Sequence, residues 1–174
     1  MKNIAVIGTG VIGTGWILRF LANDIKVKAF DKNSQQINFL KEEITRTNLI
    51  IKNLYNTKIN IKNLEIVDDI EEAVQNADLI QENVPERLTL KKDVIKNISK
   101  YSPSNSIIAS SSSGLLPSDL QLKCINPKRL IIAHPFNPVY ILPLVEIVKG
   151  KKTTNLYLNR AKKFYQKIKM KTLL

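Results

Sequence analysis

The chain has 174 residues and carries 27 Lys and Arg against 15 Asp and Glu, for a formal net charge of +12. This length suits one domain whose core can form without disulfides or metal ions, and a hydrophobic content of 44% excludes a chain that is disordered throughout. Because 22 of the 27 basic residues are lysine and aromatic residues are sparse at 6%, we do not expect a nucleic-acid-binding surface.

Short apolar runs alternate with longer stretches of helical periodicity, which predicts βαβ units around a parallel sheet. The first run, Ile4–Ile7, is apolar throughout and ends at a glycine, as expected of a strand buried on both faces. For the first half of the chain the pattern predicts strands at Ile4–Ile7, Lys26–Phe30, Leu64–Val67 and Ala77–Gln81, and helices at Val11–Ala22, 34–54 and Asp69–Gln75.

The second half continues the alternation. The pattern predicts strands at Ser106–Ala109, Leu130–Ala133 and Leu144–Val148, helices at Leu88–Lys100 and Thr154–Lys169, and a helical turn at Pro117–Leu120. Thr172–Leu174 is interpreted as the beginning of a further strand. The fold class expected is α/β, a Rossmann-type doubly wound and mostly parallel sheet with helices on both faces.

A glycine motif follows the first expected strand. Gly8-Thr9-Gly10-Val11-Ile12-Gly13 fits GxGxxG and opens a helix, which is the context that makes the motif specific for a dinucleotide. The first glycine permits a tight turn and the second lets a pyrophosphate approach the backbone. The third allows close helix–strand packing, so that phosphate lies at the positive end of the helix.

Asp31 ends the second expected strand, 18 residues after Gly13. A carboxylate at that place accepts hydrogen bonds from ribose hydroxyls and repels a 2′-phosphate, which favours NAD over NADP. The competing interpretation is a helix N-cap before Lys32-Asn33-Ser34. The order of strand, loop, helix, strand and acid favours the dinucleotide site.

Candidate catalytic residues lie in the second half. His134, the single histidine, lies directly after the strand expected at Leu130–Ala133, and Glu146 is a charged residue inside the apolar run Leu144–Val148. Ligands of open α/β sheets bind at the carboxyl ends of strands, and a carboxylate in such a run needs a partner, so one interpretation is a His–Glu pair. Ser110–Ser113 places hydroxyls at the same edge. A surface histidine, a solvent-facing glutamate and a serine-rich turn are the alternatives.

The sequence resembles the NAD-binding domain of the 3-hydroxyacyl-CoA dehydrogenase family in four segments: Gly8–Gly13, Glu82–Glu86, Ala109–Leu115 and His134–Glu146. The resemblance covers essentially the whole chain. Within that superfamily, the segments most similar to the L-carnitine (3-hydroxy acid) dehydrogenases are Gln81–Leu90, Ser113–Ser118 and His134–Leu144. The lambda-crystallin and L-gulonate 3-dehydrogenase branch shares much of this pattern.

The resemblance implies roles for individual residues. His134 is then the general base that takes the proton from the substrate hydroxyl, Glu146 orients its imidazole, and Ser113 hydrogen-bonds the reacting oxygen near the nicotinamide. The remaining matches are to positions that contact the cofactor: Glu86, Lys91 and Asn137. We expect NAD as the cofactor and no metal site.

The activity implied is NAD-dependent oxidation of a 3-hydroxy acid to the 3-oxo acid, as in the L-carnitine dehydrogenases. The alternatives are an L-3-hydroxyacyl-CoA dehydrogenase of fatty-acid metabolism and a non-catalytic, crystallin-like NAD-binding module. Phe136 and Tyr140 are candidates for contact with the trimethylammonium group of carnitine, whereas a charge of +12 suits an anionic CoA thioester.

The resemblance also bears on domain organisation. The family has a second, all-helical domain that supplies the dimer interface and much of the substrate-binding wall. We expect residues 1–174 to form the NAD-binding domain, with the helical domain absent, and a homodimer only for the full-length family.

Neither a targeting segment nor a membrane segment is expected. Gly8 cuts the first apolar run too early for a signal peptide, and no apolar stretch approaches the roughly 20 residues of a membrane span. The single cysteine, Cys124, excludes an intramolecular disulfide and suits a reducing compartment. The sequence therefore favours a cytoplasmic protein that does not bind membranes.

Overall fold

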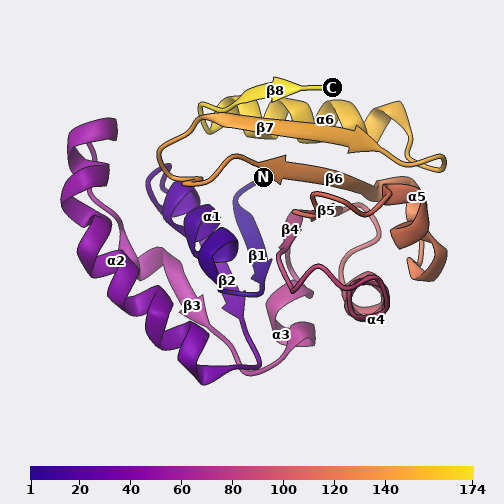
Figure 1. Ribbon diagram of the computed structural model, residues 1–174, viewed down its shortest axis with the longest axis horizontal. Helices are drawn as coiled ribbons and strands as arrows, with labels where there is room; N and C mark the ends of the chain where they lie inside the picture. Colours follow the sequence, from indigo (N-terminus) through magenta and orange to yellow (C-terminus); the bar gives the residue numbers. More distant parts are fainter.

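Eight strands form one sheet in the computed structural model, which describes residues 1–174, in the order β3-β2-β1-β4-β5-β6-β7-β8 (Figure 1). The strands are β1 (Asn3–Ile7), β2 (Lys26–Phe30), β3 (Leu64–Ile66), β4 (Leu79–Glu82), β5 (Ile107–Ser110), β6 (Leu130–Pro135), β7 (Leu144–Lys149) and β8 (Lys171–Leu173). The helices are α1 (Val11–Leu21), α2 (Ser34–Tyr55), α3 (Ile70–Val74), α4 (Leu88–Tyr101), α5 (Pro117–Leu120) and α6 (Asn155–Lys167), with 3-10 turns at Ile61–Asn63, Gln121–Lys123 and Pro127–Arg129.

All neighbouring strands are parallel except β6 and β7, which run antiparallel. The chain enters the sheet at β1, builds outward to β3, and then crosses back to place β4 on the other side of β1. The expected Rossmann-type, mostly parallel sheet is confirmed. Its reversal of strand order lies between β1 and β4, where open α/β sheets bind ligands.

The two faces of the sheet carry separate cores because side chains alternate along each strand. In β1, Ile4 and Val6 pack with α1, α2 and α6, whereas Ala5 and Ile7 pack with α3, α4 and α5. Trp16, Phe20 and Tyr165 form an aromatic cluster within the first of these cores. Figure 1 shows α3 and α4 on the side of the sheet opposite α1 and α2. Helices therefore cover both faces, as the sequence predicts.

Several element boundaries differ from the expected ones. The strand predicted from Ala77 begins at Leu79, because the N–H of Ala77 still bonds the carbonyl of Val74 in the turn after α3. The last helix ends at Lys167 instead of Lys169, whose φ of 61° is left-handed and incompatible with a helix. The strand expected at Thr172–Leu174 is present as β8 and begins one residue earlier.

The connection between β6 and β7 is anchored on the helices of the first half. The Arg19 guanidinium in α1 donates through Nε to the carbonyl of Val139 at 2.9 Å, and the Tyr55 hydroxyl in α2 donates to the carbonyl of Tyr140 at 2.6 Å. Gly15 makes room for this contact, since a Cβ there would stand 2.9 Å from Cβ of Val139. The strand that carries His134 is thereby fixed relative to the glycine motif.

None of the helices combines the length and the apolar character needed to cross a membrane.

Candidate active site

A hollow of about 610 Å³ lies at the carboxyl ends of β1, β2 and β4, where the strand order reverses. Its wall brings together four residues that the sequence predicts for a cofactor: Gly8, Gly10, Val11 and Asp31. It also contains residues that the sequence did not single out for cofactor binding, namely Gln36, Asn83, Arg87 and Leu90. Position and lining both make this hollow the candidate dinucleotide site.

Two glycines of the motif, Gly8 and Gly13, are required by the backbone itself. Gly8 has φ +91°, and a Cβ on it would lie 2.9 Å from the carbonyl of Asn83. A Cβ on Gly13 would stand 1.8 Å from the carbonyl oxygen of Gly8, so β1 and α1 can approach only without it. A Cβ on Gly10 would meet nothing closer than 3.6 Å, which leaves its outer side open to a ligand.

The start of α1 is free to receive a phosphate group. No side chain caps its first N–H groups, and its first turn holds no acidic residue. Unpaired N–H groups and the helix dipole together favour an anion at this place. The residues present therefore fit the pyrophosphate of a dinucleotide.

Asp31, directly after β2, is bonded to the glycine motif. Its Oδ2 accepts the N–H of Thr9 at 2.7 Å, and its Oδ1 accepts the N–H of Asn33 at 2.9 Å. The cap of α2 is Asn33, whose side chain accepts from Gln35, so the N-cap interpretation of Asp31 is wrong. Asp31 instead fixes the glycine turn and lines the hollow. This position suits a carboxylate that accepts ribose hydroxyls.

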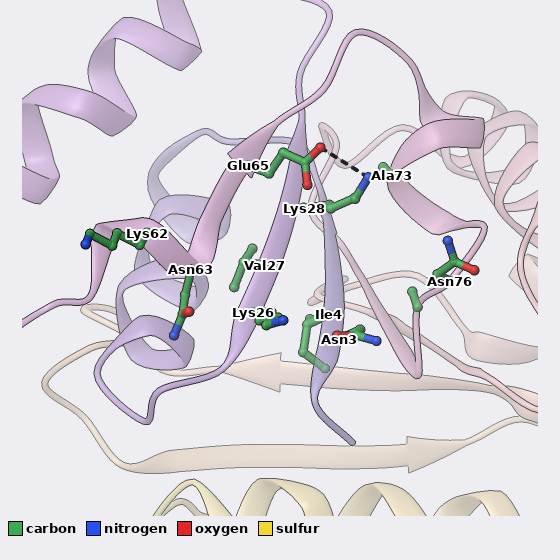
Figure 2. Close-up of a pocket in the computed structure, with 11 residues that line it drawn as sticks. Asn3, Ile4, Lys26, Val27, Lys28, Lys62, Asn63, Glu65, Ala73 and Asn76 are labelled. Atoms are coloured by element: carbon green, nitrogen blue, oxygen red, sulfur yellow. Dashed lines mark ion pairs between the residues drawn. The ribbon is translucent and has the colours of Figure 1, made fainter.

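A second hollow, of about 330 Å³, lies at the opposite, amino-terminal ends of β1 and β2 (Figure 2). Its charged lining includes Lys26, Lys28 and Lys62, and the ammonium of Lys28 is 3.2 Å from the carboxylate of Glu65. Ligands of this fold class bind at the other end of the strands. The carboxyl-terminal hollow is therefore the better candidate.

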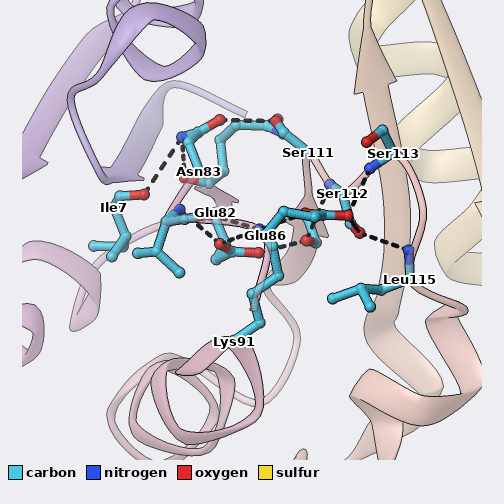
Figure 3. Close-up of polar contacts among 12 residues, drawn as sticks. Ile7, Glu82, Asn83, Glu86, Lys91, Ser111, Ser112, Ser113 and Leu115 are labelled. Carbon is cyan, nitrogen blue, oxygen red and sulfur yellow. Dashed lines mark hydrogen bonds and ion pairs between the residues drawn. The ribbon is translucent and has the colours of Figure 1, made fainter. Parts of the chain in front are cut away.

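Three consecutive serines at the end of β5 bond the last residue of β4 and the segment that follows it. Figure 3 shows two of them, Ser111 and Ser112, beside Asn83 and Glu86. Ser110 donates to the Glu82 carboxylate, Ser111 donates to Oδ1 of Asn83 at 2.7 Å, and Ser112 donates to the Glu86 carboxylate. The hydroxyl of the fourth, Ser113, makes no hydrogen bond within the chain, and this residue is exposed. The only hydroxyl of the run that is free for a ligand is that of Ser113, to which the family resemblance gives a catalytic role.

Glu86 holds the turn that presents Ser113. Its Oε1 accepts the backbone N–H of Ser113 at 3.1 Å and that of Gly114 at 3.0 Å. Partial burial raises the pKa of Glu86, but the hydrogen bonds from Ser112 and Gly114 and the charge of Lys91 outweigh it and lower the pKa below its ordinary value. Glu86 is thus an anion at the edge of the sheet.

Lys91, predicted to contact the cofactor, is almost fully buried. Its ammonium lies 2.8 Å from Oε1 of Glu82 and 3.5 Å from Oε2 of Glu86. Side-chain exposure is 2% for Lys91 and 0% for Glu82. The ammonium therefore has two carboxylate partners within the chain and is less exposed than Glu86. Glu82 is not among the site residues predicted from the sequence, although it belongs to the segment that carries the family resemblance.

His134 and Glu146 are brought together as the spacing suggests. Nδ1 of His134 lies 2.9 Å from Oε2 of Glu146, and both side chains are partly exposed. The ring of Phe136 lies beside the imidazole, with centroids 5.9 Å apart. Asn137, the last of the predicted cofactor contacts, is exposed in the same connection. The pair can accept and release a proton at the end of β6.

Comparisons with known proteins agree with this geometry. Residues 3–174 match the family model for the 3-hydroxyacyl-CoA dehydrogenase, NAD binding domain. The chain is 50% identical to an L-carnitine dehydrogenase of Oceanobacillus iheyensis over 99% of its length, and 46% identical to one of Bacillus cereus over 99%. These matches cover 57% and 53% of the relatives, so the chain spans about half the length of the curated relatives it matches.

A solved structure supports the fold. The crystal structure of 5-formyl-3-hydroxy-2-methylpyridine 4-carboxylic acid 5-dehydrogenase, an NAD-dependent dismutase, superposes with a TM-score of 0.92 and 28% identity, over 99% of this chain and 57% of that one. The glycine turn, Asp31 and the His134–Glu146 pair lie within the matched residues. The chain belongs to the 3-hydroxyacyl-CoA dehydrogenase family, of which it carries the NAD-binding domain.

Proposed function

We propose that this chain serves the NAD-dependent oxidation of a 3-hydroxy acid to the 3-oxo acid, with L-carnitine as the substrate. The observation that carries the proposal is the 2.9 Å contact between His134 and Glu146 at the carboxyl end of β6. A base oriented by a carboxylate at that edge is what removal of a hydroxyl proton requires.

The pair defines which nitrogen acts. Glu146 as a carboxylate is an acceptor only, so the hydrogen at Nδ1 of His134 points to it, and Nε2 is left to accept the proton of the substrate hydroxyl. Glu146 then stabilises the imidazolium that forms. NAD, when bound, supplies the chemistry of hydride acceptance at its nicotinamide ring.

Ser113 is the proposed second catalytic group. Its hydroxyl is unengaged, and Glu86 fixes its backbone. In the parallel β5–β6 pair Ser110 is level with Ile132. Ser113 follows the end of β5 by three residues, and His134 follows Ile132 in β6 by two, so both lie beyond that pair at the same edge of the sheet. Ser113 donates a hydrogen bond to the reacting oxygen, which His134 deprotonates. Glu86 and Asn137 are proposed as contacts of the cofactor.

Carnitine is favoured as the substrate by the relatives, since L-carnitine dehydrogenases are 40–50% identical to the chain. The exposed ring of Phe136 beside His134 offers a face to a quaternary ammonium group. Tyr140 is less available, because it packs against the core. Oxidation of a 3-hydroxyacyl-CoA is the second candidate, supported by the family's own description.

The test compares substrates and one variant. Calorimetry with NAD and NADP measures the cofactor step, and NADH formation is then followed with L-carnitine and with a 3-hydroxyacyl-CoA. We expect NAD binding, turnover of carnitine, and loss of turnover with retained NAD binding in His134→Ala. Turnover of the acyl-CoA alone would select the second candidate, and activity that survives His134→Ala would overturn the assigned base.

A further inference from the structure

A buried ion pair lies directly beneath the turn that presents Ser113. Glu82 ends β4 and Lys91 is in the first turn of α4, and their charged atoms are 2.8 Å apart with almost no solvent exposure. Lys91 also donates to the carbonyl of Val84 at 2.9 Å. Figure 3 shows Lys91 reaching from α4 toward the two glutamates.

The carboxylate of Glu82 is fully engaged. One oxygen accepts from Lys91 and from the N–H of Val84 at 2.7 Å, and the other accepts the hydroxyl of Ser110. Burial raises the pKa of Glu82, and the charge of Lys91 opposes this rise. A buried pair of this kind is often no more stabilising than apolar side chains of similar volume. Stability alone is therefore a weak explanation for two charges in this place.

The geometry of Lys91 suggests a different role. Its ammonium faces a second carboxylate, Oε2 of Glu86 at 3.5 Å, and Glu86 is 39% exposed at the edge of the site. The other oxygen of Glu86 accepts the backbone N–H groups of Ser113 and Gly114. One oxygen of Glu86 thus contacts the buried ammonium of Lys91, and its other oxygen binds the turn at Ser113 and Gly114.

We propose that Glu82 and Lys91 are positioning residues for the reaction: Glu82 fixes the ammonium of Lys91, Lys91 fixes Glu86, and Glu86 fixes the turn that presents the hydroxyl of Ser113. The proposal rests on the function proposed above for the role of Ser113. Lys91 acts on this turn through Glu86.

The decisive variant is Lys91→Met combined with Glu82→Gln. The double change removes both buried charges, whereas Lys91→Met alone leaves an unpaired buried carboxylate that destabilises the fold. The glutamine amide keeps one carbonyl oxygen as an acceptor at a site where Glu82 accepts from Ser110 and from the N–H of Val84. Lys96→Met, an exposed position on the same helix, is the matched control.

Hydrogen exchange at the amides of Ser113 and Gly114 is the main measurement, made without cofactor or substrate. We expect exchange at these two amides to become at least about 10-fold faster in the double variant, with protection of the core strands unchanged. If the core strands also lose protection in the double variant, its fold is disturbed, and the single variant Glu86→Gln provides the test instead. Glu86→Gln changes a residue that is 39% exposed. This variant keeps an acceptor for the turn but loses the attraction of Lys91, and faster exchange at both amides is again expected.

Two results would overturn the proposal. The first is protection of Ser113 and Gly114 at the level of the Lys96→Met control in both the double variant and Glu86→Gln. The second is a loss of NAD affinity in the double variant with unchanged protection of the turn, because that pattern requires direct contact between Lys91 and the cofactor. Faster exchange in a protein that fails to oxidise carnitine would leave the positioning role standing and refute only the substrate.

Discussion

His134 and Glu146 face each other across the antiparallel β6–β7 pair, in which they are direct register partners. Their separation of 12 residues in the chain is therefore set by the length of the connection between the two strands. This connection is itself bonded to α1 and α2. The orientation of the base is a property of the sheet and does not depend on a flexible loop.

Removal of the carboxylate should slow catalysis without affecting the cofactor. Glu146→Gln keeps the shape of the side chain but loses the charge that stabilises the imidazolium, so we expect kcat to fall by about 10–100-fold, against about 10²–10⁴-fold for His134→Ala. NADH formation measures both effects, with NAD affinity by calorimetry as the control. Equal kcat for Glu146→Gln and the unaltered chain would contradict the orienting role.

Asp31 should determine the choice between NAD and NADP. Asp31→Asn removes the charge that repels a 2′-phosphate and weakens the bond to the N–H of Thr9, so we expect NAD affinity to fall by about 10-fold while NADP affinity rises or stays constant. Calorimetric titrations with both cofactors measure the ratio, and Asp119→Asn, outside the hollow, is the control. Parallel losses for NAD and NADP would show that Asp31 acts only on the loop.

Gly15 should be sensitive to a single methyl group. Gly15→Ala places a Cβ 2.9 Å from Cβ of Val139, and we expect the free energy of unfolding to fall by about 1–3 kcal/mol, less any gain in helix propensity. Gly114→Ala is the matched control, because a Cβ there meets nothing within 4 Å. Urea denaturation gives both values, and equal stability of the two variants would refute the close packing.

Asp78 should make stability depend on acid pH. Burial raises its pKa, but the backbone N–H groups of Lys2 and Asn3 outweigh this and hold the pKa below its ordinary value of 3.8. The stabilisation is therefore complete above pH 3.8 and disappears as the pH falls through the lower pKa of the folded state.

The matching variant is Asp78→Asn. We expect a lower Tm than that of the unaltered chain at pH 7, and a difference that narrows below pH 3.8. Thermal denaturation followed by circular dichroism from pH 7 to acid measures this convergence. A Tm difference that does not depend on pH would exclude the carboxylate as its source.

Much of the fold could be predicted from local sequence. The apolar runs mark the strands because both faces of a parallel sheet are buried, and Gly8, Gly13 and Asp31 follow a spacing that a βαβ unit requires. The ends of elements were less predictable. Ala77 reads as strand by composition, yet its N–H is used by the turn after α3.

The partners of polar side chains could not be predicted in the same way. Lys91 in an amphipathic stretch looks like a surface residue, and only the packing of α4 against the face of the sheet brings its ammonium to Glu82. Gln36 and Arg87 enter the hollow from elements far apart in sequence, and no spacing signals them. Such contacts depend on tertiary packing, which a local pattern does not contain.

Ser110–Ser113 are four identical residues in a row, but they do not have equivalent surroundings. Their different contacts mean that substitution by another small residue has a different effect at each position. The Ser111 hydroxyl accepts from Trp16 and Gln81 while it donates to Asn83, so it has no further hydrogen-bonding capacity. Its loss removes one hydrogen bond from Trp16 in α1, one from Gln81 in β4 and one from Asn83 directly after β4. Loss of the Ser113 hydroxyl removes no hydrogen bond within the chain. Natural or engineered variation along this stretch should accordingly separate folding defects, at its start, from purely chemical ones, at its end.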